Sequence, residues 1–244
     1  MAGFFITGTD TDVGKTIVTA LLSVALNENR IKTIPYKPVQ SGSILKNSQL
    51  IAPDVDIYEK INQCHFPDSV TYLFEAPVSP HLAAKWDQVI IKKKRIDEDY
   101  NKLTHLYNCI LVEGAGGVAV PLIDESYCVS HLMQELQLPV IIVARAGLGT
   151  INHTTLTVHY LRHLGLSITG IIMNGFRYSE KLAQLENVNM IEKMTNVPVI
   201  GQLPYLENID QLLNDNELIL EFTQQLNINF IIERWKEQVY EGIK

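Results

Sequence analysis

One stretch near the amino terminus constrains the chain more than any other feature. It reads Gly-Thr-Asp-Thr-Asp-Val-Gly-Lys-Thr over residues 8–16, after the apolar run Phe4–Thr7 and before a helix-forming run. Backbone N–H groups of such a loop surround phosphate oxygens, and the positive end of the following helix adds to the attraction. Lys15 is expected to reach the outer phosphates, and the Thr16 hydroxyl to face Mg²⁺. The stretch therefore predicts a phosphate-binding loop, although its two glycines stand one residue further apart than in the general pattern.

Short apolar runs alternate with longer amphipathic stretches along the rest of the chain. Several runs are apolar throughout, which is typical of parallel strands covered on both faces. The alternation predicts a single α/β domain over residues 1–244, P-loop NTPase-like and doubly wound, with a mainly parallel sheet and helices on both faces. The expected strands are 4–7, 33–36, 109–112, 140–144, 168–173 and 197–200, and the expected helices are 15–27, 53–61, 96–106, 128–136, 150–164 and 179–194.

The carboxyl-terminal stretch is also expected to be helical. Residues 217–243 predict one or two helices that pack on the edge of the sheet or on a partner subunit.

Composition excludes several classes of protein. The net charge is −7, so the chain lacks the basic footprint of a nucleic-acid-binding protein, and we expect no such partner. Cys64, Cys109 and Cys128 form no paired motif, which favours a reducing compartment over a disulfide framework. No apolar run approaches the ~20 residues of a membrane helix, and no basic start marks a signal peptide. We therefore expect a cytoplasmic protein that binds no membrane.

An acidic residue and a run of glycines follow one of the expected buried strands. Glu113 comes directly after residues 109–112 and precedes Gly-Ala-Gly-Gly at 114–117. P-loop enzymes place a second Mg²⁺ contact at this point, made directly or through water. A helix cap or an ordinary turn is the plain alternative.

Two further segments lie at expected strand ends. Lys37 follows the run 33–36, and ligands of open α/β sheets bind beyond the carboxyl ends of the strands. By itself this signal is weak, because most such lysines are simply solvated. Residues 146–153, Ala-Gly-Leu-Gly-Thr-Ile-Asn-His, open an expected helix, and free N–H groups there suit an anion such as a carboxylate. Helix capping without a ligand explains the same residues.

Together these segments resemble the dethiobiotin synthetases, ATP-dependent carboxylases of biotin synthesis. The resemblance covers about residues 4–206, and the longer phosphate-binding loop is the family's own form. The family often carries Glu where this chain has Asp12. The segments that carry the resemblance are residues 8–16, 36–42, Asp54, 77–81, 112–117, 148–153, Asn174 and 204–206.

The resemblance implies an enzyme that uses ATP and Mg²⁺. It carboxylates 7,8-diaminononanoate with CO₂ to a carbamate, phosphorylates the carbamate, and closes the ring to dethiobiotin with release of ADP and phosphate. The implied catalytic residues are Lys15 and Lys37, and the implied Mg²⁺ ligands are Thr16, Asp54 and Glu113. The implied nucleotide-binding residues are Asp12, Val13, Gly14, Lys15, Thr16, Ile17, Asp54, Glu113, Gly114, Ala115, Gly116, Asn174, Gly175, Pro204, Tyr205 and Leu206.

The resemblance also implies a homodimer whose substrate site lies at the subunit interface. Residues 148–152 come from the neighbouring subunit in that arrangement and hold the far carboxylate of the substrate. The implied substrate-binding residues are Thr11, Ser41, Leu148, Gly149, Thr150, Ile151 and Asn152.

Two alternatives share the phosphate-binding loop. A related P-loop synthetase of the cobyric-acid type carries a glutaminase domain, for which this chain is too short. A ParA- or MinD-like ATPase switch carries an additional lysine early in the loop, and residues 9–12 contain none.

Overall fold

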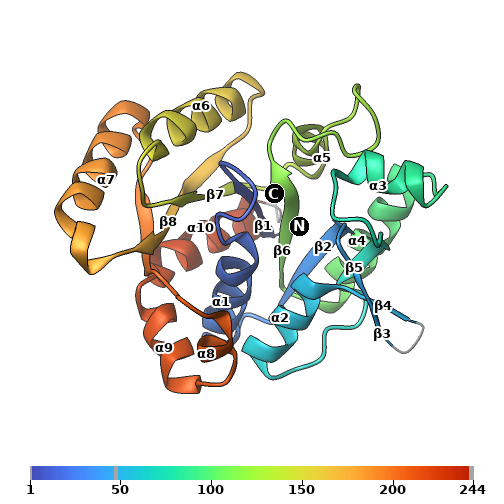
Figure 1. Cartoon of the computed structure of the whole chain (residues 1–244), viewed down its shortest axis with the longest axis horizontal. Coiled ribbons are helices and arrows are strands. Elements are labelled where there is room, and N and C mark those ends of the chain that lie inside the picture. The colour runs from blue at the N-terminus through green and yellow to red at the C-terminus, as the bar shows by residue number, and fades with distance from the viewer. Residues whose placement is uncertain (1, 47–48, 242–244) are drawn as a thin grey trace.

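The computed structural model describes residues 2–46 and 49–241. Its centre is a seven-stranded sheet in the order β5-β2-β6-β1-β7-β8-β9, and each neighbouring pair is parallel (Figure 1). The strand order reverses on either side of β1, so the chain winds outward in both directions, as a doubly wound fold requires. The strands are β1 Gly3–Gly8, β2 Thr33–Gln40, β5 Val70–Leu73, β6 Cys109–Gly117, β7 Val140–Arg145, β8 Ile168–Phe176 and β9 Val199–Pro204.

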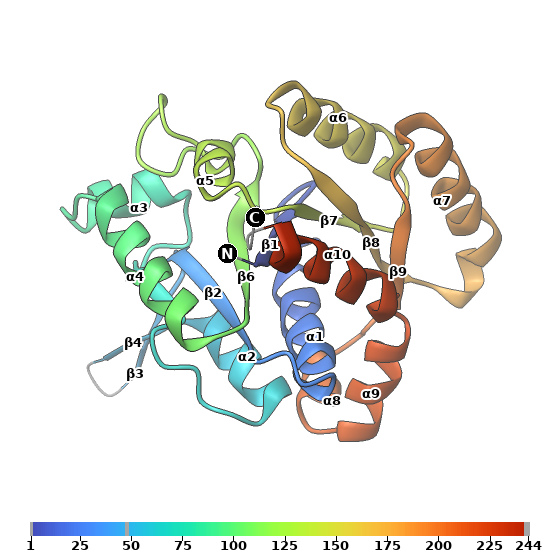
Figure 2. The same ribbon diagram turned by 180° about the vertical axis from the view of Figure 1, so that it is seen from behind.

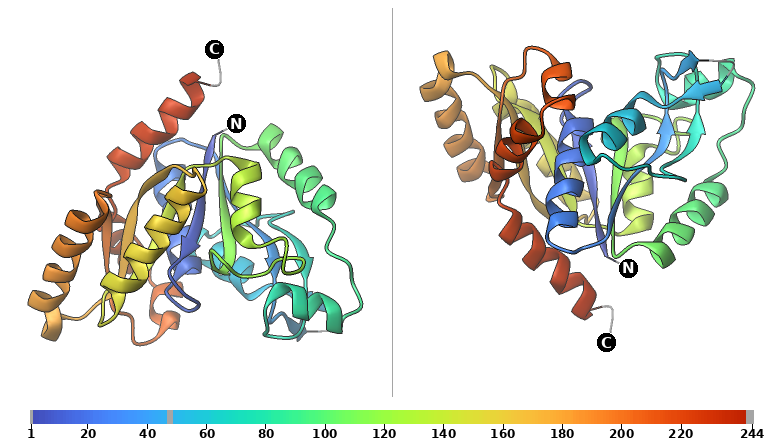
Figure 3. Two further views of the ribbon diagram at one scale, coloured as in Figure 1. Left: turned by 90° about the horizontal axis from the view of Figure 1, so that it is seen from above. Right: turned by 90° about the horizontal axis from the view of Figure 1, so that it is seen from below.

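Helices cover both faces of this sheet (Figure 3). One face carries α1 and α2, against which α9 and α8 pack, and the other carries α4 to α7. This arrangement confirms the predicted single doubly wound α/β domain. The helices are α1 Lys15–Glu28, α2 Pro53–Asn62, α3 Pro80–Trp86, α4 Lys93–Leu106, α5 Val129–Leu136, α6 Thr150–His163, α7 Lys181–Thr195, α8 Ile209–Leu213, α9 Asn216–Gln224 and α10 Ile228–Glu241, with a 3₁₀ turn η1 at Tyr178–Glu180.

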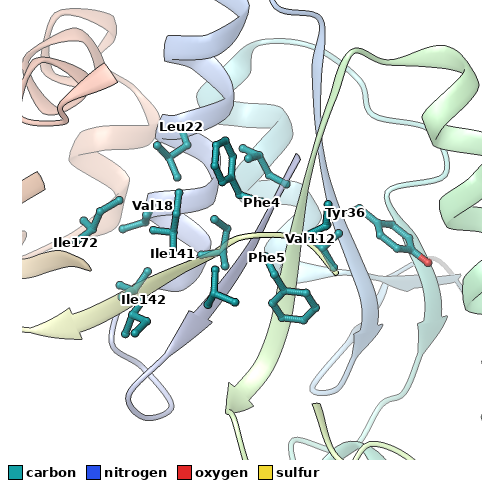
Figure 4. Close-up of a cluster of buried hydrophobic side chains, with 14 of the residues drawn as sticks. Phe4, Phe5, Val18, Leu22, Tyr36, Val112, Ile141, Ile142 and Ile172 are labelled. Atoms are coloured by element: carbon teal, nitrogen blue, oxygen red, sulfur yellow. The ribbon is translucent and has the colours of Figure 1, made fainter. Parts of the chain in front are cut away.

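The core lies on both sides of β1, the middle strand. Phe4 and Phe5 are fully buried, and successive residues of a strand point to opposite faces. Figure 4 shows Phe4 beside Leu22 of α1 and Phe5 on the other side of the strand. Each such side chain contributes about 1.5–3 kcal/mol when it leaves water. A continuously apolar strand is therefore stable where helices cover both faces of the sheet.

Several elements differ from the sequence prediction. β2 continues to Gln40 because its second half pairs with β5, a short edge strand that the sequence pattern did not reveal. β6 likewise continues to Gly117, so Lys37 and Glu113 lie within strands and not beyond them. The last strand is Val199–Pro204, later than predicted. Helix α3 and the hairpin of β3 Ile44–Lys46 with β4 Gln49–Ile51 were also missed.

The carboxyl-terminal stretch forms two helices, α9 and α10, in agreement with the prediction up to residue 241; residues 242 and 243 lie outside the described range. Between the helices, Leu226 forms an antiparallel bridge with Gly201 and covers the edge strand β9. Helix α10 then crosses the amino ends of β1 and β6, where Gln238 accepts from the Gly3 N–H and the Trp235 indole donates to the Asn108 carbonyl (Figure 2). This end of the sheet is opposite the phosphate-binding loop. Throughout residues 2–46 and 49–241, every helix is too short or too polar to cross a membrane.

Candidate active site

The site opens where two neighbouring strands separate. The β2–β6 ladder ends at the pair Tyr36 and Val112, after which β2 pairs only with β5. The next residue on each strand is Lys37 or Glu113, and both side chains are buried in the gap. The sheet therefore opens a polar gap at its carboxyl edge, which is the edge where ligands of open α/β sheets bind.

The phosphate-binding loop borders this gap on the side of β1. Gly14 has φ +96° and is the N-cap residue of α1, whose first N–H groups have no side-chain cap. A Cβ on Gly14 would lie 2.1 Å from Nδ2 of Asn174, whose amide also donates to the Val13 carbonyl at 3.0 Å. Asn174, at the end of β8, thus packs against the loop and requires glycine there. Asp12, also at positive φ (56°), is exposed at the tip of the loop.

Three charged side chains and one hydroxyl form a cluster in the gap; Lys37 and Glu113 are buried, and Asp54 and Thr16 are partly buried. The Lys37 ammonium lies 2.7 Å from Asp54 and 2.7 Å from Oε1 of Glu113. The Thr16 hydroxyl donates to the same Glu113 oxygen at 3.0 Å. The three predicted Mg²⁺ ligands and one predicted catalytic lysine are therefore linked, Asp54 and Glu113 through the Lys37 ammonium and Thr16 through Glu113.

The two lysines have opposite electrostatic surroundings. Burial lowers the pKa of the Lys37 ammonium, but the charges of Glu113 and Asp54 outweigh this effect and raise the pKa above its ordinary value. The pKa of Lys15 is lowered, first by burial and then by the neighbouring Lys37 charge. The Lys15 ammonium donates to the Asp10 carbonyl at 2.9 Å. Lys37 therefore stays protonated, whereas the protonated form of Lys15 is stabilised by any additional negative charge that binds beside it.

A cleft of about 790 Å³ lies over these residues. It brings together Thr11 and Ser41, predicted to contact substrate, with both lysines and the acidic pair. Val39, Gln40, Ile57, residues 77–80 and Ile209 also line it and were not predicted as site residues. The predicted residues that line the cleft are Thr11, Asp12, Gly14, Lys15, Thr16, Ile17, Lys37, Ser41, Asp54, Glu113, Ala115 and Gly116.

Tyr58 is a further residue that the sequence analysis missed. It lies on α2 one turn after Asp54 and donates from its hydroxyl to Oε2 of Glu113 at 2.5 Å. The spacing of four residues after Asp54 was the available signal, because such residues share one face of a helix.

Two predicted sets lie outside this cleft. Residues 148–152 begin α6, and the Leu148 side chain is fully exposed. Asn174, Gly175 and residues 204–206 lie at the ends of β8 and β9, where the Arg177 guanidinium is 3.3 Å from the centre of the Tyr205 ring. Val13 is buried in the loop and does not line the cleft. The Cα of Gly114 packs against Phe5, and only its carbonyl reaches the site, where it accepts from the Lys37 ammonium at 3.3 Å.

The oxygen atoms that surround Lys37 are suitable ligands for a magnesium ion. Among the described residues no three His, Cys, Asp or Glu side chains gather as a metal site by themselves. Mg²⁺ characteristically takes one or two carboxylates and completes its shell with phosphate oxygens and waters. Asp54, Glu113 and the Thr16 hydroxyl offer only oxygen atoms, beside a loop built for phosphates, and so match that requirement.

A phosphate-binding loop that opens onto buried charges at the carboxyl edge of a parallel sheet defines a P-loop nucleotide-binding protein, and the AAA domain family model matches residues 2–212. Within that class the chain belongs to the family of the ATP-dependent dethiobiotin synthetases. It is 54% identical to the ATP-dependent dethiobiotin synthetase BioD of Anoxybacillus flavithermus, over 85% of this chain and 94% of that protein. The BioD proteins of Halalkalibacterium halodurans and Bacillus subtilis are each 40% identical, over 88% and 86% of this chain and 89% and 90% of theirs.

Solved structures of other proteins share the fold. A ParA family ATPase from Chlorobium tepidum superposes with a TM-score of 0.56 at 13% identity, over 95% of this chain and 99% of that one. The MinD cell division protein of Aquifex aeolicus gives 0.56 at 14% identity, over 98% and 97%. Identities this low show the fold alone. The sequence relatives therefore favour the predicted synthetase family over the ParA/MinD alternative.

Proposed function

We propose that this chain is an ATP- and Mg²⁺-dependent dethiobiotin synthetase that acts in the cytoplasm. It carboxylates 7,8-diaminononanoate with CO₂ and closes the product to a cyclic urea, with release of ADP and phosphate. The observation that carries the proposal is the Lys37 ammonium, buried between two carboxylates beside the phosphate-binding loop. Such a cation suits a reaction whose intermediates are anionic, and the family relationship supplies the substrates.

The chemistry has three steps. One amine of the substrate attacks CO₂ and loses a proton, which leaves a carbamate. A carbamate oxygen attacks the γ-phosphorus of ATP, the bond to the bridging oxygen breaks, and ADP leaves. The second amine attacks the carbonyl carbon of the mixed anhydride, the bond to the phosphate oxygen breaks, and the amine gives up a proton. Little covalent work falls to the protein, so positioning and charge stabilisation dominate.

The two lysines supply the positive charge. Lys37 remains protonated because of its carboxylate neighbours, and it neutralises the carbamate during attack. Lys15, whose pKa is lowered, is most strongly stabilised as a cation when phosphate oxygens replace the Asp10 carbonyl. Thr11 and Ser41 line the same cleft and contact the amine end of the substrate.

Thr16, Asp54 and Glu113 hold the magnesium ion. When bound, Mg²⁺ neutralises charge on the phosphate oxygens. Asn174, Gly175 and residues 204–206 bind the adenine, and the exposed ring of Tyr205 under Arg177 supports this assignment because it provides a flat surface. Residues 12–17 and 113–116 complete the nucleotide site.

The active form is a homodimer in this proposal. Residues 148–152 do not line the cleft of their own chain; Leu148 is fully exposed, and no side chain caps the first N–H groups of α6. These N–H groups hold the far carboxylate of a substrate bound to the partner subunit.

The deciding experiment measures phosphate release from ATP by the purified protein. Release is expected only when both 7,8-diaminononanoate and bicarbonate are present. Full-rate release without the diamine contradicts the proposal and favours a nucleotide switch like the ParA and MinD proteins.

A further inference from the structure

We infer that Tyr58 is a positioning residue for the magnesium site, and that its hydroxyl holds the Glu113 carboxylate in the orientation that meets the metal. The inference rests on the proposed role of Glu113 as a metal ligand, and it adds to the site a residue outside the phosphate-binding loop and the strand ends.

The two oxygens of Glu113 have different partners. Oε1 accepts from Lys37 at 2.7 Å and from Thr16 at 3.0 Å, so this oxygen faces the phosphate side of the site. Oε2 accepts from the Tyr58 hydroxyl at 2.5 Å. A carboxylate held at both oxygens cannot rotate about its last bond. Tyr58 therefore helps to fix the plane of the carboxylate that Glu113 presents to the cleft.

Tyr58 is the donor best able to keep this role during a reaction. Lys37 and Thr16 have other partners in the proposed function, a carbamate and the metal. The Tyr58 side chain is fully buried and lines no part of the cleft. Substrate and nucleotide therefore have no place to compete for its hydroxyl, and Glu113 remains its acceptor.

Helix α2 holds Tyr58 firmly. Asp54, one turn earlier on the same helix, pairs with Lys37 at 2.7 Å. Asn62, one turn later, accepts from the Ser23 hydroxyl at 2.8 Å and donates to the Ala20 carbonyl at 3.3 Å, both on α1. Since α1 begins at the phosphate-binding loop, these bonds fix Tyr58 relative to Thr16. The same two helices, α1 and α2, therefore place Thr16 and Asp54 and also fix the position of the donor to Oε2 of Glu113.

Loss of the Tyr58 hydroxyl should weaken metal binding. Oε2 would then be buried without a donor, and the carboxylate would be free to turn away from the metal. Removal of a group that orients a metal ligand typically lowers metal affinity about 10–100-fold. Tyr58→Phe is the suitable change, because it deletes one oxygen and keeps the ring in the core.

Tyr36→Phe provides a matched control. Tyr36 is also fully buried, and its hydroxyl forms a hydrogen bond of 2.5 Å with the Thr71 hydroxyl. This bond lies on the far side of β2 from the cluster around Lys37. Both variants lose the hydroxyl of a fully buried tyrosine, which bonds to Glu113 in Tyr58 and to Thr71 and the Ile96 carbonyl in Tyr36. A general effect of a looser core should therefore appear equally in both.

The experiment measures Mn²⁺ binding to the full chain in the presence of ADP by electron paramagnetic resonance. We expect Tyr58→Phe to bind Mn²⁺ at least about 10-fold more weakly than Tyr36→Phe, with ADP affinity measured without metal unchanged. Equal Mn²⁺ affinities in the two variants overturn the inference.

A kinetic measurement gives an independent check. In the diamine-dependent assay, Tyr58→Phe should raise the Mg²⁺ concentration needed for half-maximal rate, and saturating Mg²⁺ should restore most of kcat. A fall in kcat with unchanged Mg²⁺ dependence contradicts the positioning role. Because Mn²⁺ and ADP bind without diamine or bicarbonate, the binding result also separates failure of this inference from failure of the proposed reaction.

Discussion

Lys37 and Glu113 directly follow Tyr36 and Val112, the last pair of the β2–β6 ladder, and their side chains meet at 2.7 Å. Beyond this point β2 leaves β6 for β5, so the sheet itself provides the cavity that the ion pair fills. A buried ammonium and carboxylate in such a gap have consequences for turnover, for stability and for the pH dependence of both.

Replacement of Lys37 by alanine should lower turnover far more than nucleotide binding. Lys37 is assigned to the charge that develops on the carbamate, whereas the phosphates are held by the loop. Loss of one such stabilising group typically lowers kcat about 10²–10³-fold. Steady-state kinetics and ATP titration check this expectation. A variant that loses only ATP affinity would show that Lys37 has a different role.

Lys37→Met should also destabilise the fold. It leaves Glu113, which is 1% exposed, without its ammonium partner, and breaking a buried pair on one side typically costs about 3–5 kcal/mol. Chemical denaturation of the variant and the wild type at neutral pH measures this difference.

The difference in unfolding free energy between wild type and Lys37→Met should become smaller at high pH. Because the folded-state pKa of Lys37 is raised, its contribution is fully present below the unfolded value of about 10.5 and is lost as pH rises above it. The gap in unfolding free energy between wild type and Lys37→Met should therefore stay constant from neutral pH and shrink above that value. A gap that grows at high pH would contradict the assigned sign.

Gly14→Ala should impair nucleotide binding through the backbone. The added Cβ would lie 2.1 Å from Nδ2 of Asn174, and φ at this position is +96°. A left-handed conformation costs a residue with a side chain about 1–2 kcal/mol, so ATP affinity should fall about tenfold or more. Gly147→Ala is the control, because its Cβ would meet nothing within 4 Å. Equal ATP affinity in both variants would show that Gly14 and Asn174 are not tightly packed.

The proposed shared site predicts complementation between subunits. Lys37→Ala removes a group of the cleft, and Gly149→Val distorts the turn at the start of α6, where φ is +90°. Each variant should be nearly inactive by itself. Mixing the two under conditions of subunit exchange should restore part of the activity, because a hybrid dimer contains one intact site. No recovery, with exchange verified by mass spectrometry, would show that each subunit works independently.

Local patterns predicted most of the helices and the central strands. The apolar run of β1, the loop after it and the start of α1 follow from neighbouring residues, because strand alternation and helix initiation are short-range properties. The edge strand β5 and the hairpin of β3 and β4 were missed for the same reason. Val70–Leu73 is only four residues long and each hairpin strand only three, so none is long enough to show a periodic pattern.

The site was predicted in outline. Lys15, Lys37, Asp54 and Glu113 were all named from the sequence, the first from its loop motif and the others with the help of the family resemblance. Their mutual geometry was not predicted, and neither was Tyr58. Lys37 and Glu113 are 76 residues apart, and only the shared register of β2 and β6 brings them into contact.

The sequence by itself determined that this chain binds phosphates, because the loop of residues 8–16 needs only its own backbone and the helix that follows it. Tertiary structure decided where Lys37 points, how the Glu113 carboxylate is oriented, and that α10 covers the end of the sheet away from the site. These depend on packing between distant segments, and the free energy of such packing comes from burial that no local pattern specifies.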